Sequence, residues 1–209
     1  MLHKNLLLIS LLFFTSLSLG KSYEININFE SGFEYKSQKE FVDNIHLSKS
    51  KKEMEYLIND QDWIKKYSIR YKPFSKKVFI NIANREPIFI FNETYFYDRD
   101  LNKFNFDQSK KNLIMVKGPI DDLRQVIKLI NIIESTAPIQ FKINSINYSY
   151  VNGWDIKSKN TLIRFGNELT KKRFNNYQKT VNYLLEISKI PSIIDVRYKD
   201  GVALNYGKQ

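Results

Sequence analysis

Hydrophobic and polar residues alternate along several short stretches of the chain, which is the pattern of half-buried β-strands. The clearest examples lie at 25–29 and 78–82, where isoleucine, valine and phenylalanine occupy every second position. Between them, two stretches place apolar residues three or four positions apart, as on one face of a helix. Each stretch follows a serine that has a glutamate three residues further on, at Ser37 and Ser50, a spacing typical of a capped helix start. Residues 23–90 therefore predict the order strand, helix, helix, strand, strand.

The chain beyond Pro87 has a different pattern, in which strands outnumber helices. Proline cannot continue a strand ladder, so Pro87 is expected to end the first region. We expect two helices after it, one beginning near Pro119 and one over about 168–188. The other apolar stretches are short and rich in β-branched and aromatic residues, and they predict strands at 88–91, 94–97, 104–106, 141–150, 154–157, 161–165, 193–198 and 202–206. The region is thus predicted to be a mainly antiparallel β domain with two helices.

An apolar run occupies residues 6–19 near the start of the chain, between Lys4 and Lys21. About 15 residues of helix cover only about 22 Å, and a bilayer core is roughly 30 Å thick, so flanking residues must help if the run spans it. The run has two interpretations: a transmembrane anchor over 5–22 behind a cytoplasmic tail at 1–4, or a signal peptide cleaved after Gly20. Both place the rest of the chain across the membrane, because the positive charge precedes the run.

The composition argues against most classes of enzyme. The chain has no cysteine, and His46 is the only histidine besides His3, so thiolate nucleophiles and multi-histidine metal sites are excluded and no cofactor is expected. Its seven glycines form no phosphate-binding motif. The net charge of +11 comes from lysines scattered singly and in pairs. This scatter favours a solvated basic surface, and the alternative is attraction to an anionic membrane or cell-wall polymer.

Four groups of short motifs follow one another along the chain. They are Gln61-Asp62-Trp63 with Ile69-Arg70 and the strand 78–82; Arg85-Glu86-Pro87 with Asp98-Arg99-Asp100; Trp154-Asp155 with Leu162–Gly166 and Lys172-Arg173-Phe174; and Ile194–Ala203. In this order the sequence resembles the FtsQ/DivIB family of bacterial cell division proteins. It departs from the family at the Asp98 turn, where the usual glycine is missing and Asn102 is expected to take the left-handed conformation, and at Tyr206, where tryptophan is common.

The resemblance implies an α+β fold in three parts. An N-terminal single transmembrane helix over 5–22 would precede a POTRA domain over 23–90 and an FtsQ-type β domain over 91–209. The protein would be a non-enzymatic, single-pass inner-membrane protein with its body in the periplasm at the division septum, without catalytic residues, cofactor, metal, nucleic acid or small-molecule substrate. It would bind the FtsB–FtsL pair and link early to late division proteins. The alternatives are a POTRA-type chaperone of envelope assembly or translocation, and a glycan-binding or hydrolytic protein.

The last predicted hairpin is the expected partner-binding site. An outermost strand leaves backbone N–H and C=O groups unpaired, and an incoming strand can satisfy them. We expect this edge to bind FtsB or FtsL through seven residues: Arg197, Tyr198, Asp200, Gly201, Val202, Leu204 and Tyr206. In the alternative interpretation Tyr198 packs on the sheet, Arg197 pairs with Asp195 or Glu168, and Gly201 serves only a tight turn with positive φ.

Overall fold

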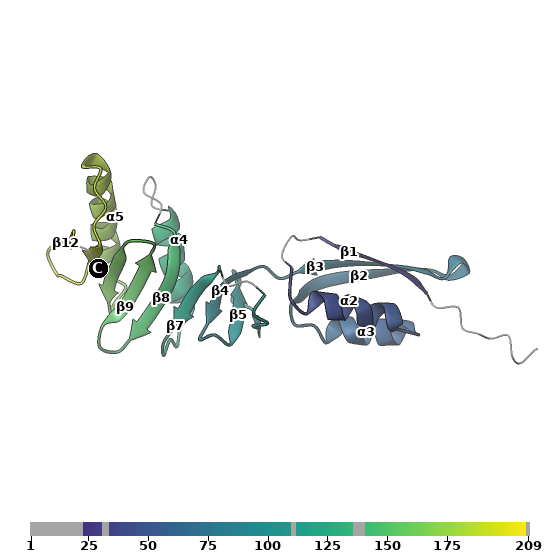
Figure 1. Cartoon of the computed structure of the whole chain (residues 1–209). Coiled ribbons are helices and arrows are strands. Elements are labelled where there is room, and N and C mark those ends of the chain that lie inside the picture. Colours follow the sequence, from purple (N-terminus) through teal and green to yellow (C-terminus); the bar gives the residue numbers. More distant parts are fainter. Residues whose placement is uncertain (1–22, 31–33, 110–111, 136–140, 208–209) are drawn as a thin grey trace, which may run out of the picture. The chain divides into compact units, whose positions relative to one another are not determined.

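The structure of the chain is a computed structural model that describes residues 23–30, 34–109, 112–135 and 141–207 (Figure 1). The described residues form two compact units. The first unit contains the described residues up to Glu30 together with Ser37–Asn84. The second contains residues 34–36 and the described chain from Arg85 onward.

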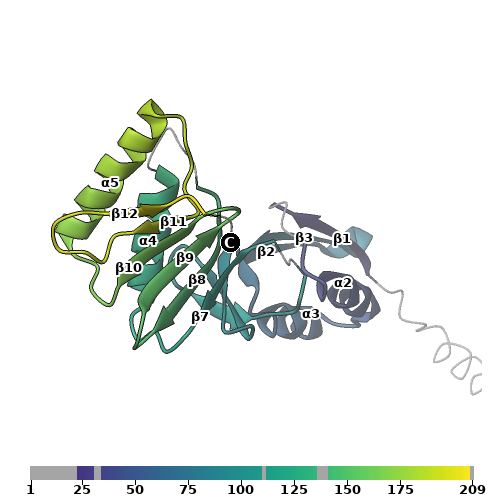
Figure 2. The same cartoon turned by 60° about the vertical axis from the view of Figure 1, so that its left-hand side comes forward.

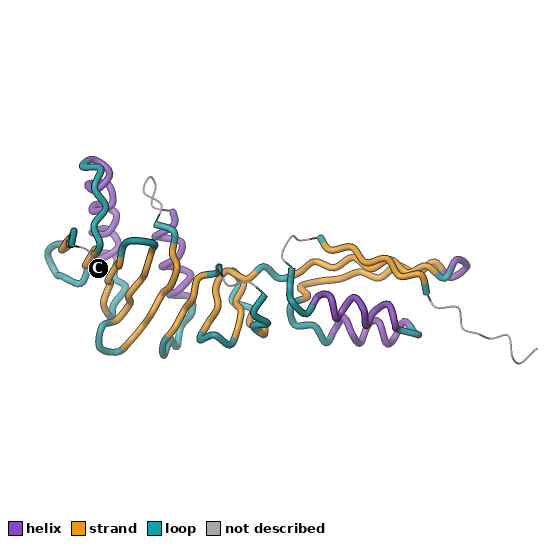
Figure 3. Tube along the Cα trace, viewed as in Figure 1, coloured by secondary structure: helices purple, strands orange, loops and turns teal. Residues whose placement is uncertain are grey.

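The first unit is a three-stranded sheet with two helices. Its elements are β1 (Glu24–Phe29), α2 (Gln38–Leu47), α3 (Lys51–Asn59), β2 (Ile64–Lys72), the short 3-10 helix η1 (Pro73–Ser75) and β3 (Lys77–Asn84). The strand order is β1-β3-β2, with β1 parallel and β2 antiparallel to β3. Both helices lie against one face of the sheet (Figure 3). The predicted order of strand, helix, helix, strand, strand is therefore present.

Local signals explain the helices of this unit. The Ser50 hydroxyl accepts a hydrogen bond from the Glu53 backbone N–H at 3.2 Å, which caps α3 as the sequence predicts. The helices bury apolar residues at positions three or four apart, and β3 buries every second residue. These buried residues are Phe41, Ile45, Met54, Ile58, Val78, Ile80 and Ile82.

The second unit is a nine-stranded sheet with two helices. Its elements are β4 (Pro87–Phe91), β5 (Tyr95–Asp98), β6 (Lys103–Asn105), β7 (Ile114–Lys117), α4 (Arg124–Ser135), β8 (Ile143–Ser149), β9 (Gly153–Ser158), β10 (Leu162–Gly166), α5 (Lys171–Glu186), β11 (Ile193–Asp195) and β12 (Ala203–Asn205). The strand order is β12-β11-β10-β9-β8-β7-β4-β5-β6, and Figure 2 shows its part from β12 to β7. The pairs β4–β7, β7–β8 and β10–β11 are parallel and the others are antiparallel.

Helices α4 and α5 share one core with the sheet. Their buried residues include Leu129 and Ile133 on α4 and Tyr177 and Val181 on α5, and they pack with the inward side chains of the strands, such as Ile156. The opposite face of the sheet carries mostly polar and charged side chains on β8 to β11, together with the half-buried Leu162 and Ile193. The sheet therefore has one helix-covered face and one open face, and it ends at β12 and β6.

Two local predictions in this unit are wrong. The helix expected near Pro119 begins at Arg124, because the Asp122 carboxylate accepts hydrogen bonds from the Arg124 backbone N–H and Nε, at 3.1 and 2.7 Å. At the Asp98 turn, Leu101 takes the left-handed conformation, with φ of 61°. Asn102 instead donates from its backbone N–H and side-chain amide to the Asp98 carboxylate.

The expected transmembrane anchor over 5–22 and cytoplasmic tail over 1–4 lie outside the described residues. Within the described residues, no helix is long and apolar enough to cross a membrane. For the described residues the fold class is therefore corrected to α+β, and the expected membrane-spanning helix is not carried further. The expected single-pass inner-membrane localisation, with the body in the periplasm, rested on that helix and is withdrawn on the same finding.

Candidate functional site

Strand β12 forms one edge of the nine-stranded sheet. Its neighbour is β11, in the register Ile193↔Asn205, Ile194↔Leu204 and Asp195↔Ala203. On its other side, no strand pairs with it among the described residues. A strand with one neighbour directs about half of its backbone N–H and C=O groups away from the sheet. β12 therefore offers a short backbone edge for another polypeptide (Figure 2).

Side chains of the β12 region alternate between the core and solvent. Val202 and Leu204 are half-buried and pack against the core of the second unit. Ala203 and Asn205 are exposed on the open face of the sheet, and Tyr206 after them is 50% exposed. The inward residues hold the strand in place, while the outward residues and Tyr206 are accessible to a partner.

A row of polar residues crosses the open face and ends at β12. Strand pairing places Asn147 beside Asp155, Asp155 beside Arg164, Arg164 beside Asp195, and Asp195 beside Ala203. The Arg164 Nε lies 3.7 Å from the Asp155 carboxylate. Charges of opposite sign thus alternate along the row until Ala203, where the small side chain leaves the edge sterically open.

Asp195 and Arg197 form the strongest polar contact near this edge. The Asp195 carboxylate accepts hydrogen bonds from the Arg197 backbone N–H at 3.1 Å, from Nε at 2.9 Å and from a terminal guanidinium nitrogen at 2.6 Å. The side chain of Asp195 is 10% exposed and that of Arg197 is 37% exposed. The guanidinium is therefore already engaged within the chain, in agreement with the alternative interpretation of Arg197.

The two carboxylates of the row have pKa values that shift in opposite directions. Burial alone would raise the pKa of Asp195, but the hydrogen bonds from Arg197 outweigh it and the pKa is lowered. Burial also raises the pKa of Asp155, and there Arg164 offsets the effect only in part. Asp195 is thus a firmly ionised partner of Arg197, whereas ionisation of Asp155 is opposed by its surroundings.

The connection from β11 to β12 is longer than the tight Lys199–Gly201 turn that the sequence predicts. β11 ends at Asp195 and β12 begins at Ala203. Gly201 is not among the residues with positive φ, and a Cβ built on it would meet nothing within 4 Å. The turn interpretation of Gly201 is therefore wrong, and this position is open to solvent.

Two other expected site residues lie on this connection. Tyr198 is 58% exposed, so it does not pack on the sheet in the described structure. The Asp200 carboxylate lies 3.2 Å from the Lys172 ammonium of α5, and both side chains are exposed. Such an exposed pair contributes little stability, but it places the connection beside the start of α5.

The start of α5 is strongly basic, and the sequence patterns did not predict it as part of the site. The Thr170 hydroxyl caps the helix by accepting from the Arg173 backbone N–H at 3.3 Å. The first turn of α5 contains three cations, Lys171, Lys172 and Arg173, and no acidic residue. The helix dipole at this end favours anions, so it opposes these charges. A shallow cleft of about 190 Å³ separates this turn from Arg197, Tyr198 and Lys199. Three consecutive cations directly after a capping threonine are the sequence signal that could have revealed it.

The described residues contain no group of three or more histidines or carboxylates placed to hold a metal ion. The features brought together near β12 are a free backbone edge, two exposed tyrosines and a basic helix start. An unpaired strand edge and exposed aromatic side chains are common in protein-binding surfaces.

One comparison with known proteins identifies a family for this region. The family model of the cell division protein FtsQ/DivIB, C-terminal, matches residues 92–197. This stretch covers just over half of the 209-residue chain and runs from the turn before β5 to the residues that follow β11. No curated protein matches the chain.

Proposed function

The chain belongs to the FtsQ/DivIB family of cell division proteins, and on this basis we propose that it binds the FtsB–FtsL pair by strand addition at β12. The family is non-enzymatic, acts in cell division and interacts with other division proteins. More specifically, we propose that the protein is a scaffold that links early and late division proteins through the β12 edge. We also propose that residues 23–90 form a POTRA domain, which the strand order β1-β3-β2 and the two helices support.

The observation that carries the proposal is the position of β12 at the end of the sheet. A three-residue strand can offer a partner about two to four backbone hydrogen bonds, each with a net contribution of about 1 kcal/mol. Micromolar affinity requires about 8 kcal/mol. The backbone edge alone is therefore too short, and side chains beside it must supply the remainder.

The side chains around β12 can supply that remainder. Tyr198 and Tyr206 flank the strand, and each is at least half exposed, so a partner can bury large apolar surface on them. Val202 and Leu204 pack against the core, and a partner on β12 would cover only the part of each side chain that is still exposed. Gly201 leaves room for a partner backbone to approach. Arg197, held by Asp195, positions the connection rather than binding a partner carboxylate freely.

Crosslinking at the two ends of the nine-stranded sheet tests the proposal. Photoreactive residues at Ala203 and Asn205 on β12 are compared with the same residues at Lys103 and Asn105 on β6, an equally short edge strand with exposed side chains at both positions. We expect FtsB to crosslink at positions 203 and 205 and not at 103 and 105 in dividing cells. Equal crosslinking at both ends, or crosslinking at β6 alone, would rule out β12 as the binding edge.

Substitutions beside the edge provide a second test. Tyr198→Glu and Gly201→Pro are expected to abolish co-purification of FtsB, because they introduce charge or rigidity where the partner lies. Tyr56→Glu is the matched control, since Tyr56 is a similarly exposed tyrosine on α3 of the first unit. The folded state of each variant is checked by near-UV circular dichroism. Retention of FtsB by both folded variants would show that the terminal hairpin is not the binding surface.

A further inference from the structure

The connection between β2 and β3 carries the most exposed large apolar side chain of the described residues. Phe74, in η1, is fully exposed, at 105% of its reference area. In this connection Lys76 takes the left-handed conformation, with φ of 50°, and the Ser75 hydroxyl donates a hydrogen bond to the Lys72 carbonyl oxygen at 3.4 Å. The phenyl ring is therefore presented to solvent by a defined turn.

The sequence on both sides of Phe74 is basic. Residues 65–77 contain six lysines or arginines and no aspartate or glutamate. Two of the six pair with acids: Lys77 with Glu24 on β1 at 2.9 Å, and Lys66 with Glu30, directly after β1, at 3.7 Å. Lys72 and Lys76 lie on either side of Phe74 in the sequence and are both exposed. The tip thus combines an apolar side chain with excess positive charge.

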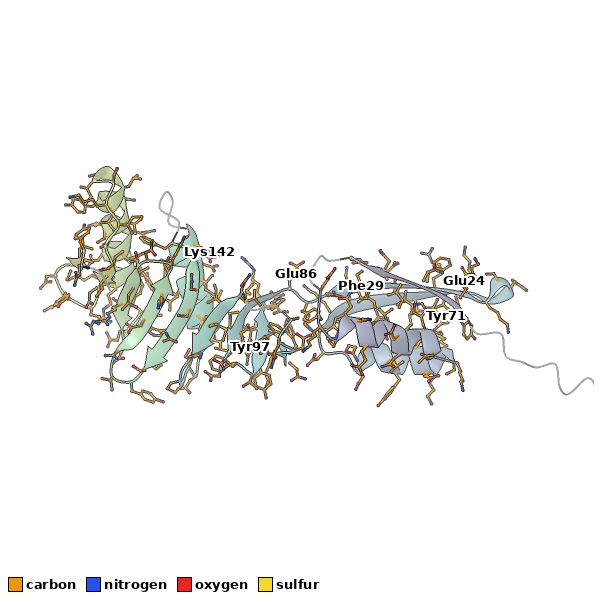
Figure 4. The ribbon with its side chains drawn as sticks, in the orientation of Figure 1. Glu24, Phe29, Tyr71, Glu86, Tyr97 and Lys142 are labelled. Atoms are coloured by element: carbon orange, nitrogen blue, oxygen red, sulfur yellow. The ribbon has the colours of Figure 1, made fainter. Side chains whose placement is uncertain are left out.

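The base of the tip is fixed to the rest of the first unit. The β2–β3 ladder continues to the pair Lys72↔Lys77, directly below the turn. Tyr71 packs edge-on against Tyr23 with 6.5 Å between ring centroids, and the Lys51 ammonium lies 4.9 Å from its ring. Glu24 and Tyr71 both lie toward this end of the sheet (Figure 4). These contacts hold the base from which the turn projects.

We propose that this tip, residues 72–77, binds the surface of a lipid bilayer that contains anionic phospholipids. Phe74 inserts at the boundary between headgroups and acyl chains, and Lys72 and Lys76 lie against the phosphates. Aromatic side chains are favoured at that boundary, and lysines near an anionic leaflet are attracted to it. A hydrated anionic polymer would attract the lysines but would gain nothing from Phe74. The contact needs no membrane-spanning helix and does not depend on partner binding at β12.

A single fluorescent label tests the proposal, because the chain contains no cysteine. In the full chain, Ser75→Cys carries an environment-sensitive fluorophore next to an intact Phe74. Tyr56→Cys on α3, also exposed, is the control position. We expect blue-shifted emission and quenching by spin-labelled lipid at position 75 with vesicles of phosphatidylcholine and phosphatidylglycerol, and neither change at position 56. The label reports locally, so association of another part of the chain with the vesicles does not produce the signal.

Side-chain variants in the labelled chain separate the two contributions. Lys76→Glu is expected to lower partitioning of the tip about fivefold or more, since each lysine near an anionic surface contributes that factor. Phe74→Ser is expected to abolish quenching by the spin-labelled lipid, and Lys52→Glu on α3 to leave the signal unchanged. The proposal is overturned if position 75 shows no change with anionic vesicles, if phosphatidylcholine alone gives the same change, or if Phe74→Ser and Lys76→Glu have no effect.

Discussion

The contact between Asp195 and Arg197 provides the sharpest quantitative test of how the β12 edge is held. Removing one partner of a charge-assisted hydrogen bond costs about 1.5–3 kcal/mol when the other group stays buried. Removing Arg197 leaves the nearly buried Asp195 carboxylate without its partner. Removing Asp195 leaves the Arg197 guanidinium, which is more exposed, so water can replace part of the lost interaction. We therefore expect Arg197→Ala to lower the free energy of unfolding by about 2 kcal/mol and Asp195→Ala by about 1 kcal/mol. Their coupling in a double-mutant cycle should be about 1 kcal/mol.

The assay must report the second unit alone. The chain has two tryptophans, Trp63 in the first unit and Trp154 in the second. In a Trp63→Phe background, urea unfolding followed by Trp154 fluorescence measures the unit that contains Asp195 and Arg197. A coupling energy below about 0.3 kcal/mol would refute the argument, because it would show that the contact does not hold the connection before β12.

The same variants distinguish two roles of Arg197 in binding. If Arg197 only positions the connection, Asp195→Ala and Arg197→Ala should weaken FtsB binding to a similar extent, measured by calorimetry where both variants are folded. If Arg197 contacts a partner carboxylate directly, Arg197→Ala alone should weaken binding. The structure favours the first result, since the guanidinium is already bound by Asp195.

Three further predictions concern the stability of the chain. Gly153→Ala should unfold the second unit or lower its free energy of unfolding by more than about 3 kcal/mol, because φ is 72° and a Cβ would lie 1.9 Å from the Gly166 carbonyl carbon. The control, Gly201→Ala, should change the free energy of unfolding by less than about 1 kcal/mol, and equal effects in urea unfolding would contradict this prediction. Tyr35→Phe should cost the second unit about 1 kcal/mol in the same assay, because its hydroxyl donates to the Arg85 carbonyl at 2.5 Å, and an unchanged midpoint would contradict it. Asp155→Asn should raise the free energy of unfolding at neutral pH, because burial raises the pKa of Asp155 and so opposes its ionisation in the folded state. The gain should vanish as the pH falls to about 4, where the carboxyl of the unfolded chain takes up its proton. A gain in stability that persists at lower pH would contradict this prediction.

The pH dependence of the Asp195 contact has the opposite sign. The folded pKa of Asp195 is lowered, so its contribution to stability is present above the unfolded value of about 3.9 and is lost as the pH falls through the folded value. The difference in free energy of unfolding between Asp195→Asn and the unsubstituted chain, followed from neutral pH to pH about 3, measures this contribution. A difference in stability that stays constant over that range would show that the carboxylate is not stabilised by Arg197.

Sequence patterns predicted the elements whose causes are local. The alternation at 25–29 and 78–82 and the serine before α3 act within a few residues, and the structure has these elements where they were expected. The apolar alternation of the last two strands also predicted a terminal hairpin, and β12 does end the sheet. The parallel pairing of β10 with β11 joins strands separated by a whole helix, so no local pattern reveals it.

Side-chain capture of backbone groups explains what the patterns missed. Asp122 accepts the Arg124 backbone N–H and so sets the helix start that Pro119 was expected to give. Asp195 accepts the backbone N–H of Arg197, and β11 ends there instead of continuing to residue 198. Each of these contacts depends on an aspartate two residues before the group it captures, a spacing that is common in sequences and not specific enough to predict them.

Amide hydrogen exchange across Ala203–Asn205 tests strand addition most directly, because it reports the backbone groups themselves. With FtsB added to the full chain, the account predicts slower exchange of the outward-facing amides of β12, while the amides of β6 at the other end of the sheet keep their rates. Binding of FtsB without any added protection at β12 would contradict strand addition at this edge.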